Sequence, residues 1–494
     1  MGSLDQREFF NIVNDERRGS SVTHRVTDPR TEEDLWECPV ASTQDLEDAI
    51  DAANKAFPAW SKTTLAERQA LLVKIADRIK EHAAELTELA LMGAIEINNT
   101  VEQTLYYSKV GLEDEVQFED ESIKIIATHM PLGVVGAICP WNFPIILSNI
   151  KIASSIVTGN CVIIKPSPFT PYSVLRSVEV CLGVLPKGVL QVVNGGADLG
   201  ALMTQHPGIH KISFTGTIAT GKRVMAACAQ TLKKVTLELA GNNAAIVCPD
   251  VDIPHAVAQT AAGSFFNAGQ MCVATKRIYV HRDIYEPFVK TFCEEASNAY
   301  VIKDDPQEMS LFGPVANKMQ FDIVKDILED AKKAGGKVLA GGKVRDGKGF
   351  WIEPTVVAEP PEDSLLVQEE QFGAFSSHHM SEKSRHQDKS SLTNFSNLGP
   401  IVPILSWSEE DDVISRANLD NSGLGATVYS QDLSRAERIA RRLEAGTVWI
   451  NMSEKPNPGA WFSGQKNSGF GGEMGKQGLL SYSYTKSIHY PKGK

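Results

Sequence analysis

One cysteine in the sequence lies on a short turn between two elements that could hold it in a fixed position. Cys272 follows Asn267-Ala268-Gly269-Gln270-Met271, and a helix is predicted before this turn, over Ile253 to Phe266. The apolar run Arg277 to Val280 after it predicts a buried strand. A cysteine at such a point can act as a nucleophile if one neighbouring group removes its proton and another stabilises the negative charge that forms when the thiolate attacks. Most single cysteines are small buried apolar residues, so Cys272 needs support from the rest of the chain.

Five short apolar runs alternate with helical patterns in the middle of the chain and predict the strands of one sheet. They are Val134–Cys139, Cys161–Lys165, Leu190–Val193, Lys211–Phe214 and Val235–Leu239. Strands that are apolar along most of their length and separated by helices indicate a parallel sheet covered on both faces. Two amphipathic helices, Thr43–Phe57 and Leu65–Leu91, are predicted in the outer layer. The predicted fold is a doubly wound α/β domain, in which ligands bind at the carboxyl ends of the strands.

Polar groups follow or occupy several of these strands. Asn142, on a stiff turn between prolines, could donate its amide hydrogens to an oxyanion or could support its own turn. Lys165 places a cation at a strand tip, where it would suit a ribose or a phosphate. Gly216 and Gly221 open a helix whose free N–H groups favour a pyrophosphate. Glu238 lies inside an apolar run, either as a buried structural partner or as a base tuned by burial.

Composition limits the class of protein and its partners. A chain of 494 residues should form two or three domains. The net charge of −12, with no basic stripe among aromatic residues, argues against nucleic acid as a partner. Eight scattered cysteines without a CxxC pair predict a reducing compartment and no metal site. No signal core and no run of transmembrane length are found, so the predicted location is the cytoplasm, without membrane attachment.

Several of these segments, taken together, resemble the aldehyde dehydrogenase superfamily. The segments are Pro140-Trp141-Asn142-Phe143-Pro144, Lys165-Pro166-Ser167, Phe214-Thr215-Gly216-Thr217, Leu237-Glu238-Leu239-Ala240-Gly241, Phe265 to Cys272, Glu369 to Gly373, Gly446 to Asn451 and Lys466 to Gly469. They stand in the order of the family and at nearly its spacing, from about Thr43 to the carboxyl end.

The resemblance implies a subunit of three parts. A doubly wound, Rossmann-like cofactor-binding domain would take residues 1–112 and 132–240, and an α/β catalytic domain would take residues 241–467. A small β oligomerisation flap would be formed by residues 113–131 and 468–494. The alternating run Ser481 to Tyr490 fits a strand added to a neighbour's sheet. A homodimer or homotetramer is expected.

The resemblance also assigns catalytic roles. Cys272 would attack the aldehyde, while the Asn142 amide and the Cys272 N–H would hold the oxyanion. Hydride would then pass to NAD or NADP, and Glu238 would deprotonate the water that hydrolyses the thioester.

Contacts with NAD or NADP are implied at further positions. Lys165 and Glu370 would hold ribose hydroxyls, Phe372 would pack beside the nicotinamide ribose, and Gln320 matches a position that can touch the adenosine ribose. The other positions assigned to cofactor binding are Trp141, Ser167, Pro168, Phe214, Thr215, Gly216, Thr217, Gly221 and Leu239.

Two alternatives remain beside hydrolytic aldehyde oxidation. A relative that transfers the acyl group to coenzyme A shares the fold and the cysteine but usually lacks the glutamate base. A catalytically impaired or silent scaffold would keep the fold for binding alone. The presence of Glu238 favours hydrolysis, and thioester accumulation would separate the three.

The sequence departs from the family pattern in four places. Pro168 stands where NAD-selective members often carry a glutamate, which removes both a hydrogen-bond acceptor and the repulsion of a 2′-phosphate. The chain is short around Leu91 to Ala94, and Ala460 to Gly464 replaces a family segment at the substrate entrance. An extra segment, Ala374 to Gly399, is predicted to be disordered or a loose loop that can be deleted. Its histidines, His378, His379 and His386, are interpreted as solvated and not as metal ligands.

Overall fold

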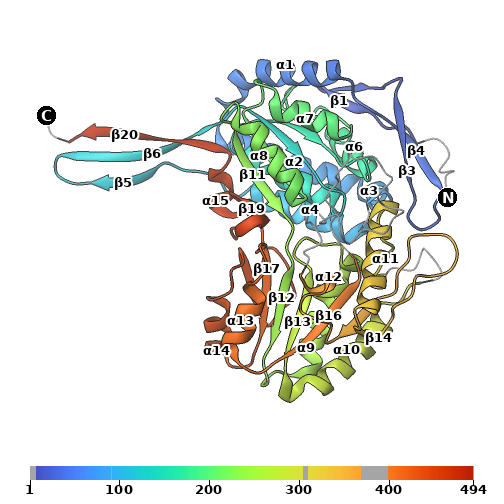
Figure 1. Ribbon diagram of the computed structural model, residues 1–494. Coiled ribbons are helices and arrows are strands. Elements are labelled where there is room, and N and C mark those ends of the chain that lie inside the picture. Colours follow the sequence, from blue (N-terminus) through green and yellow to red (C-terminus); the bar gives the residue numbers. More distant parts are fainter. Residues whose placement is uncertain (1–6, 91, 304–309, 369–398, 493–494) are drawn as a thin grey trace.

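The computed structural model describes residues 7–90, 92–303, 310–368 and 399–492. Two large sheets, each packed with helices, form two bodies, and a narrow three-stranded arm projects from the first body (Figure 1). No helix within the described ranges is both long and apolar enough to cross a bilayer. The predicted insert, apart from Gly399, lies outside the described residues.

The first sheet has the strand order β19-β11-β10-β7-β8-β9-β1-β2. Its bounds are β19 Gly469–Phe470, β11 Lys234–Leu239, β10 Lys211–Gly216, β7 Val134–Ile138, β8 Cys161–Lys165, β9 Leu190–Val192, β1 Asn11–Val13 and β2 Glu16–Arg18. The strands from β11 to β9 run parallel, while β19 and β1 are antiparallel to their neighbours. The sheet predicted from the apolar runs is confirmed, with strand ends within two residues of the prediction.

The helices of the first body either lie in the chain between the amino-terminal strands and β7 or connect the parallel strands. They are α1 Thr43–Trp60, α2 Leu65–Glu81, α3 Ala83–Leu89, α4 Gly93–Tyr107, α5 Pro144–Val157, α6 Pro171–Glu179, α7 Ala197–Gln205 and α8 Ile218–Ala229. The prediction of one helix over residues 65–91 was wrong, because the chain leaves helical geometry at His82 (ψ 15°). Both parts pack on α4, but α2 also packs on α5 whereas α3 also packs on α6.

The second sheet has the strand order β14-β15-β16-β13-β12-β17-β18. Its bounds are β14 Lys337–Ala340, β15 Thr355–Ala358, β16 Ile401–Trp407, β13 Thr275–His281, β12 Asn243–Val247, β17 Gly425–Tyr429 and β18 Thr447–Ile450. Its helices are α9 Ile253–Phe265, α10 Tyr285–Ala299, α11 Lys318–Lys333, α12 Leu365–Gln368, α13 Glu410–Asn418 and α14 Leu433–Ala440. The predicted helix and strand on either side of Cys272 are therefore present as α9 and β13. Six of the other seven cysteines are buried as predicted, but Cys293 on α10 is only partly buried.

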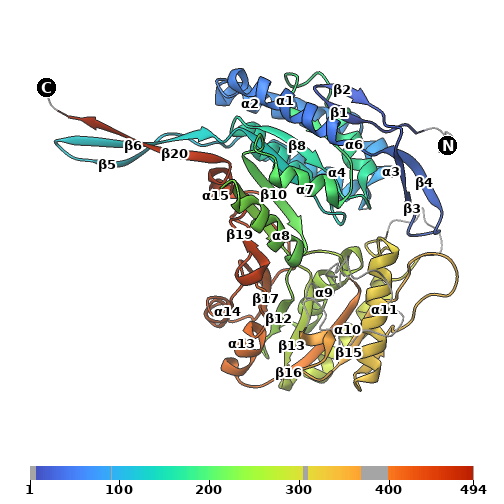
Figure 2. The same cartoon turned by 45° about the horizontal axis from the view of Figure 1, so that its top comes forward.

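The arm consists of β5 Glu115–Glu119, β6 Ile123–Pro131 and β20 Ser483–Pro491, and it extends far from the body in both views (Figure 2). The last strand, β20, follows the short helix α15 Gly475–Leu480 and pairs antiparallel with β6 of the same chain, from Ser483 opposite Pro131 to Pro491 opposite Ile123. It therefore forms the edge of its own sheet. Addition of this strand to a neighbouring subunit stays a prediction.

Candidate active site

The loop that carries Cys272 turns sharply after α9. Residues 267–269 all have left-handed backbone angles, with φ of 52°, 52° and 69°. For the two of these residues that carry a Cβ, this conformation is unfavourable and needs support from tertiary contacts. Gln270 supplies such contacts, because its buried Oε1 accepts the N–H of Ala316 at 2.8 Å and its Nε2 donates to the carbonyl of Asn267 at 2.9 Å. The turn before Cys272 is thus locked by one side chain.

Asn243, the first residue of β12, holds the other side of this loop. Its Nδ2 donates to the carbonyls of Cys272 and Ala274 at 2.9 and 2.8 Å, and its Oδ1 accepts the N–H of Gly425 at 2.9 Å. The sequence prediction missed Asn243. The available signal was a pair of amides, Asn242 and Asn243, directly before the apolar run Ala244 to Val247.

Glu238 and Cys272 are in direct contact. The Cys272 thiol donates to Oε1 of Glu238 at 3.0 Å, and Oε2 accepts from the Thr215 hydroxyl at 3.0 Å. Thr215 of β10 lies opposite Glu238 of β11 in the parallel pairing, which fixes the second contact. Burial raises the pKa of Glu238, and burial together with the Glu238 charge raises the pKa of Cys272 well above its usual range. The carboxylate, only 4% exposed, is placed to take the proton of the thiol.

A buried ion pair lies behind this contact. Lys151 of α5 donates to Oε1 of Glu473 at 2.8 Å and to the Thr215 hydroxyl oxygen at 3.0 Å, and Ser213 donates to Glu473 at 2.6 Å. Burial is the largest single influence on the pKa of Lys151 and acts to lower it, but the charges of Glu473, Cys139 and Glu238 and the hydrogen bond to Glu473 together raise it. Thr215 therefore joins the ion pair to Glu238, whereas its predicted contact with the cofactor stays a prediction.

The sequence prediction missed both members of this ion pair. Lys151 carried a signal, because it is the one charged residue in the helix Pro144–Val157 and an isolated charge in an apolar helix requires a partner. Glu473, beside Gly471 and Gly472, carried none that points to Lys151.

Asn142 lies between β7 and α5, next to the nucleophile loop. Its Nδ2 donates to the carbonyl of Gln270 at 3.1 Å, and its own carbonyl accepts from Nδ2 of Asn267 at 3.3 Å. Nδ2 carries a second hydrogen, and Oδ1 is buried with no hydrogen-bond partner among the described residues. The Asn142 amide is therefore anchored beside Cys272, where it can donate to a new acceptor.

Lys165 at the end of β8 meets the requirements of a ribose or phosphate contact. Its ammonium group donates to the backbone carbonyls of Pro166 and Gly195, both at 2.8 Å, and burial lowers its pKa to about 8. These partners are neutral, so the positive charge is available to an anionic or hydroxyl-bearing ligand at the carboxyl edge of the parallel sheet. The residues present thus fit an NAD-type cofactor.

Pro168 is contacted by a segment that the sequence prediction did not consider. The hairpin β3 Thr23–Thr27 and β4 Asp34–Pro39 places Nε2 of His24 at 2.6 Å from the Pro168 carbonyl. Ser167 turns inward, and its hydroxyl accepts the N–H of Phe169 at 3.3 Å. Ser167 and Pro168 are therefore both held next to Lys165 by hydrogen bonds with neighbouring residues.

The other predicted cofactor residues lie around the start of α8 or farther away. Gly221 lets α8 approach β11, because an added Cβ would lie 2.6 Å from the Leu239 side chain. The Thr217 hydroxyl caps α8 by accepting the N–H of Thr220 at 3.2 Å. Phe214 and Leu239 are buried, Gly216 ends β10, the Trp141 carbonyl accepts from Thr170, and Gln320 is buried in α11. Glu370 and Phe372 lie outside the described residues.

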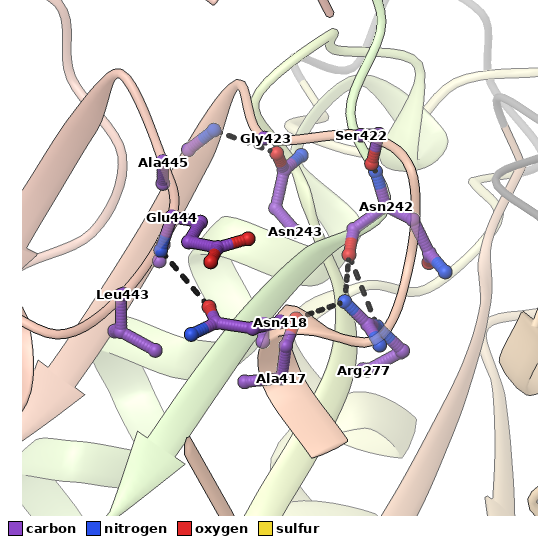
Figure 3. A pocket seen from close by; sticks show the side chains of 13 residues that line it. Asn242, Asn243, Arg277, Ala417, Asn418, Ser422, Gly423, Leu443, Glu444 and Ala445 are labelled. Carbon is purple, nitrogen blue, oxygen red and sulfur yellow. Dashed lines mark hydrogen bonds between the residues drawn. The ribbon is translucent and has the colours of Figure 1, made fainter. Parts of the chain in front are cut away.

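A small cavity lies beside Asn243 and is lined by Asn242, Arg277 and Asn418, among others (Figure 3). The Arg277 guanidinium donates to the carbonyls of Asn242 at 2.7 Å and Ala417 at 3.0 Å. A volume of about 20 Å³ suits a water molecule and is too small for a cofactor or an aldehyde. The described residues contain no group of three or more His, Cys, Asp or Glu arranged to hold a metal ion.

Known proteins are similar to this chain over nearly its whole length. The model of the aldehyde dehydrogenase family matches residues 17–379 and 384–488. The chain belongs to the aldehyde dehydrogenase family. It is 40% identical to aldehyde dehydrogenase LUC3 of a Fusarium species, over 99% of this chain and 100% of the relative. It is also 34% identical to the chloroplastic aminoaldehyde dehydrogenase ALDH10A8 of Arabidopsis thaliana, over 94% of this chain and 92% of that protein.

Solved structures of the family have the same fold. The NAD+ complex of an aldehyde dehydrogenase from Bacillus cereus has a TM-score of 0.89 and 32% identity, and the match covers 98% of this chain and 97% of that structure. This aldehyde dehydrogenase is therefore an oxidoreductase that acts on aldehydes with an NAD-type cofactor. The family and the α/β fold predicted from the sequence are both confirmed.

Proposed function

We propose that this aldehyde dehydrogenase oxidises apolar aldehydes to carboxylic acids through a thiohemiacetal and a thioester on Cys272. The observation that carries the proposal is the 3.0 Å contact between the Cys272 thiol and the Glu238 carboxylate, with the Asn142 amide anchored beside the same loop. A nucleophile, a base and an oxyanion donor are thereby gathered at one point.

The first half of the reaction joins the substrate to the protein. Glu238 removes the thiol proton, and the thiolate of Cys272 attacks the carbonyl carbon to form the thiohemiacetal. The new oxyanion is stabilised by Nδ2 of Asn142 and by the backbone N–H of Cys272. When bound, an NAD-type cofactor supplies the acceptor for the hydride that leaves this carbon, and a thioester remains on the sulfur.

The second half of the reaction releases the acid. Glu238 first releases the thiol proton to solvent and then removes a proton from a water molecule, whose oxygen attacks the thioester carbonyl. The carbon–sulfur bond breaks, Cys272 leaves as a thiolate and the carboxylic acid departs. Burial suits Glu238 to this role, because a carboxylate with a raised pKa is a stronger base than an exposed one.

An apolar cluster beside Cys272 supports the proposed substrate class. Ile150, Val273, Leu424, Trp449, Phe462 and Met474 form a buried group, against which Leu147, Met271 and Cys272 pack. Phe462 belongs to the segment that departs from the family pattern at the substrate entrance. Such surroundings favour an aliphatic or aromatic aldehyde over a charged one.

Cofactor choice, assembly and location belong to the same proposal. We expect use of NAD with only modest discrimination against NADP, since Pro168 offers no carboxylate to the adenosine ribose. The exposed apolar side chains of the arm, Val116 and Phe118 of β5 and Tyr484 and Tyr490 of β20, support a homodimer or homotetramer. Eight cysteines without a disulfide are consistent with a reducing, cytoplasmic setting.

Two variants test the proposed chemistry with an apolar aldehyde and NAD. Cys272→Ala should form no reduced cofactor and still bind NAD, whereas the control Cys293→Ala should behave as wild type. Glu238→Gln should give one burst of reduced cofactor per site followed by slow turnover, because the thiol, without the charge of Glu238 beside it, can lose its proton to solvent, whereas hydrolysis is blocked. Steady turnover by Glu238→Gln would remove this residue as the base. Acceleration of turnover by coenzyme A would favour the acyl-transferring alternative, and absence of any reduced cofactor with wild type would favour a silent scaffold.

A further inference from the structure

A carboxylate outside the site already described is buried beside the helix that follows Asn142. Glu96 of α4 is 1% exposed. Its Oε1 accepts the backbone N–H of Ile145 at 2.7 Å and that of Ile146 at 3.2 Å. Its Oε2 is buried with no hydrogen-bond partner among the described residues. Burial of a carboxylate this deeply costs free energy, and the hydrogen bonds from two helix N–H groups offset part of that cost.

These two N–H groups belong to the first turn of α5. The helix begins at Pro144, and its capping residue Phe143 has no side chain that can accept a hydrogen bond. The first N–H groups of a helix have no partner within it and carry a partial positive charge, which a carboxylate satisfies best. Glu96, which belongs to another helix, therefore caps the amino terminus of α5. A serine or an aspartate at the N-cap position has this role in an ordinary helix.

The position of α5 affects two parts of the active site. Asn142 stands two residues before the helix, so the first turn of α5 defines one end of the short loop that carries its amide. Lys151, farther along the same helix, contacts Thr215 and Glu473. Burial raises the pKa of Glu96 to about 7, while the N–H groups of Ile146, Ile145 and Met92 act to lower it. The side chain thus offers an oxygen acceptor to the helix start whether or not it is charged.

We propose that Glu96 is a positioning residue for aldehyde oxidation, which anchors the first turn of α5 and thereby aims the Asn142 amide at the oxyanion formed on Cys272. This inference rests on the proposed function, because the oxyanion is part of that chemistry. Small displacements of an oxyanion donor slow a reaction strongly, so loss of the anchor should affect hydride transfer more than binding.

Three substitutions separate positioning from folding. Glu96→Gln keeps an oxygen acceptor at the same distance and removes the charge. Glu96→Ala removes the acceptor. Glu96→Asp keeps a carboxylate but shortens the side chain by one methylene, so the acceptor lies farther from α5. Thr104→Val is the matched control, because Thr104 also joins α4 to α5, through a 3.1 Å hydrogen bond to Oδ1 of Asn149, but far from Asn142.

The measurements are the burst rate of reduced cofactor with hexanal and NAD, the thermal midpoint, NAD affinity, and the rate of Cys272 alkylation by iodoacetamide. Glu96→Ala should lower the burst rate at least tenfold, with NAD affinity and alkylation within about threefold of wild type, and Glu96→Gln should keep the burst rate within about threefold. Thr104→Val should lower the thermal midpoint and leave the burst rate within the same limit. If Glu96→Ala does not fold, Glu96→Asp must show the selective loss of burst rate.

Two results would overturn the inference. One is an unchanged burst rate in Glu96→Ala, or in Glu96→Asp where the alanine variant does not fold. The other is a burst rate that falls in Thr104→Val as much as in the Glu96 variants, since the effect would then follow stability. A wild-type enzyme that forms no reduced cofactor from hexanal and NAD would instead refute the proposed function, so the two failures are distinguishable.

Discussion

The Sγ atom of Cys272 lies 3.0 Å from Oε1 of Glu238, so the nucleophile rests against the group proposed to deprotonate it. The pKa of Cys272 is raised first by burial and then by the negative charge of Glu238. The carboxylate thus has two opposite effects: its negative charge disfavours the thiolate, and its oxygen can accept the thiol proton. Removal of the charge should separate these two effects.

We expect Glu238→Gln to lower the pH at which Cys272 becomes reactive toward iodoacetamide. The variant loses the repulsion between carboxylate and thiolate, and a shift of about one pH unit corresponds to about 1.4 kcal/mol. Alkylation rates measured between pH 6 and 10, in a Cys293→Ala background to remove the other partly exposed thiol, would give the midpoint. An unchanged midpoint would show that burial alone controls the thiol.

Removal of only one member of the Lys151–Glu473 ion pair should destabilise the folded protein. Lys151→Met leaves the Glu473 carboxylate buried without a countercharge and should lower the free energy of unfolding by about 3–5 kcal/mol. The double variant Lys151→Met/Glu473→Gln should recover most of this loss, because no buried charge remains. Urea unfolding of both variants beside wild type measures the difference. Equal stability of the single and double variants would contradict a charge-based explanation.

A carboxylate at position 168 should sharpen cofactor selection. Wild type is expected to prefer NAD over NADP by less than about a thousandfold in kcat/KM, or about 4 kcal/mol. Pro168→Glu should raise this ratio at least tenfold, because a carboxylate accepts from the ribose hydroxyls and repels a 2′-phosphate. Pro168→Ala, which removes the ring without adding a charge, should not raise it. A wild-type preference beyond a thousandfold would require a clamp elsewhere.

Glu454 should make stability depend on pH. Burial raises its pKa to about 7, and its Oε2 has no hydrogen-bond partner among the described residues. The protonated side chain is favoured in the folded protein, so stability is full below pH 4.5 and is lost as the pH rises to about 7, by about 3 kcal/mol. Glu454→Gln should therefore gain thermal stability over wild type between pH 5 and 7.5, and the gain should level off above that range.

The matched control for Glu454 is Glu16→Gln, at an exposed side chain. Its difference from wild type should stay small across the same pH range, since exposed ion pairs contribute little. A gain for Glu454→Gln that does not change with pH would show that the Glu454 carboxyl does not titrate in this range.

The sequence was sufficient to predict those elements that are determined by the local pattern of apolar residues. Strands such as Cys161–Lys165 are apolar along their length and stand between helices, so their type and order could be predicted, and with them the edge at which Asn142 and Lys165 lie. The break at His82 could not be predicted, because α2 and α3 diverge to meet different helices.

Contacts between distant parts of the chain escaped prediction. Lys151 and Glu473 are 322 residues apart, and Glu96 and Ile145 are 49 residues apart. In each pair the role of the side chain becomes clear only when its partner is known. Pattern indicates that a buried charge needs a countercharge or a donor, but only the packing of helices shows which one it meets.

The burial of Lys151 against Glu473 has a consequence for synthesis on the ribosome. Lys151 is translated 322 residues before its partner, and β19, which completes the sheet beside Glu238, comes just before that partner. Until then α5 holds a buried ammonium group without its countercharge, so the amino-terminal body cannot settle into its final packing while translation continues. A chain that stops before residue 473 keeps this defect. Nascent and truncated chains should therefore stay open to chaperones and proteases, and only the finished enzyme should escape them.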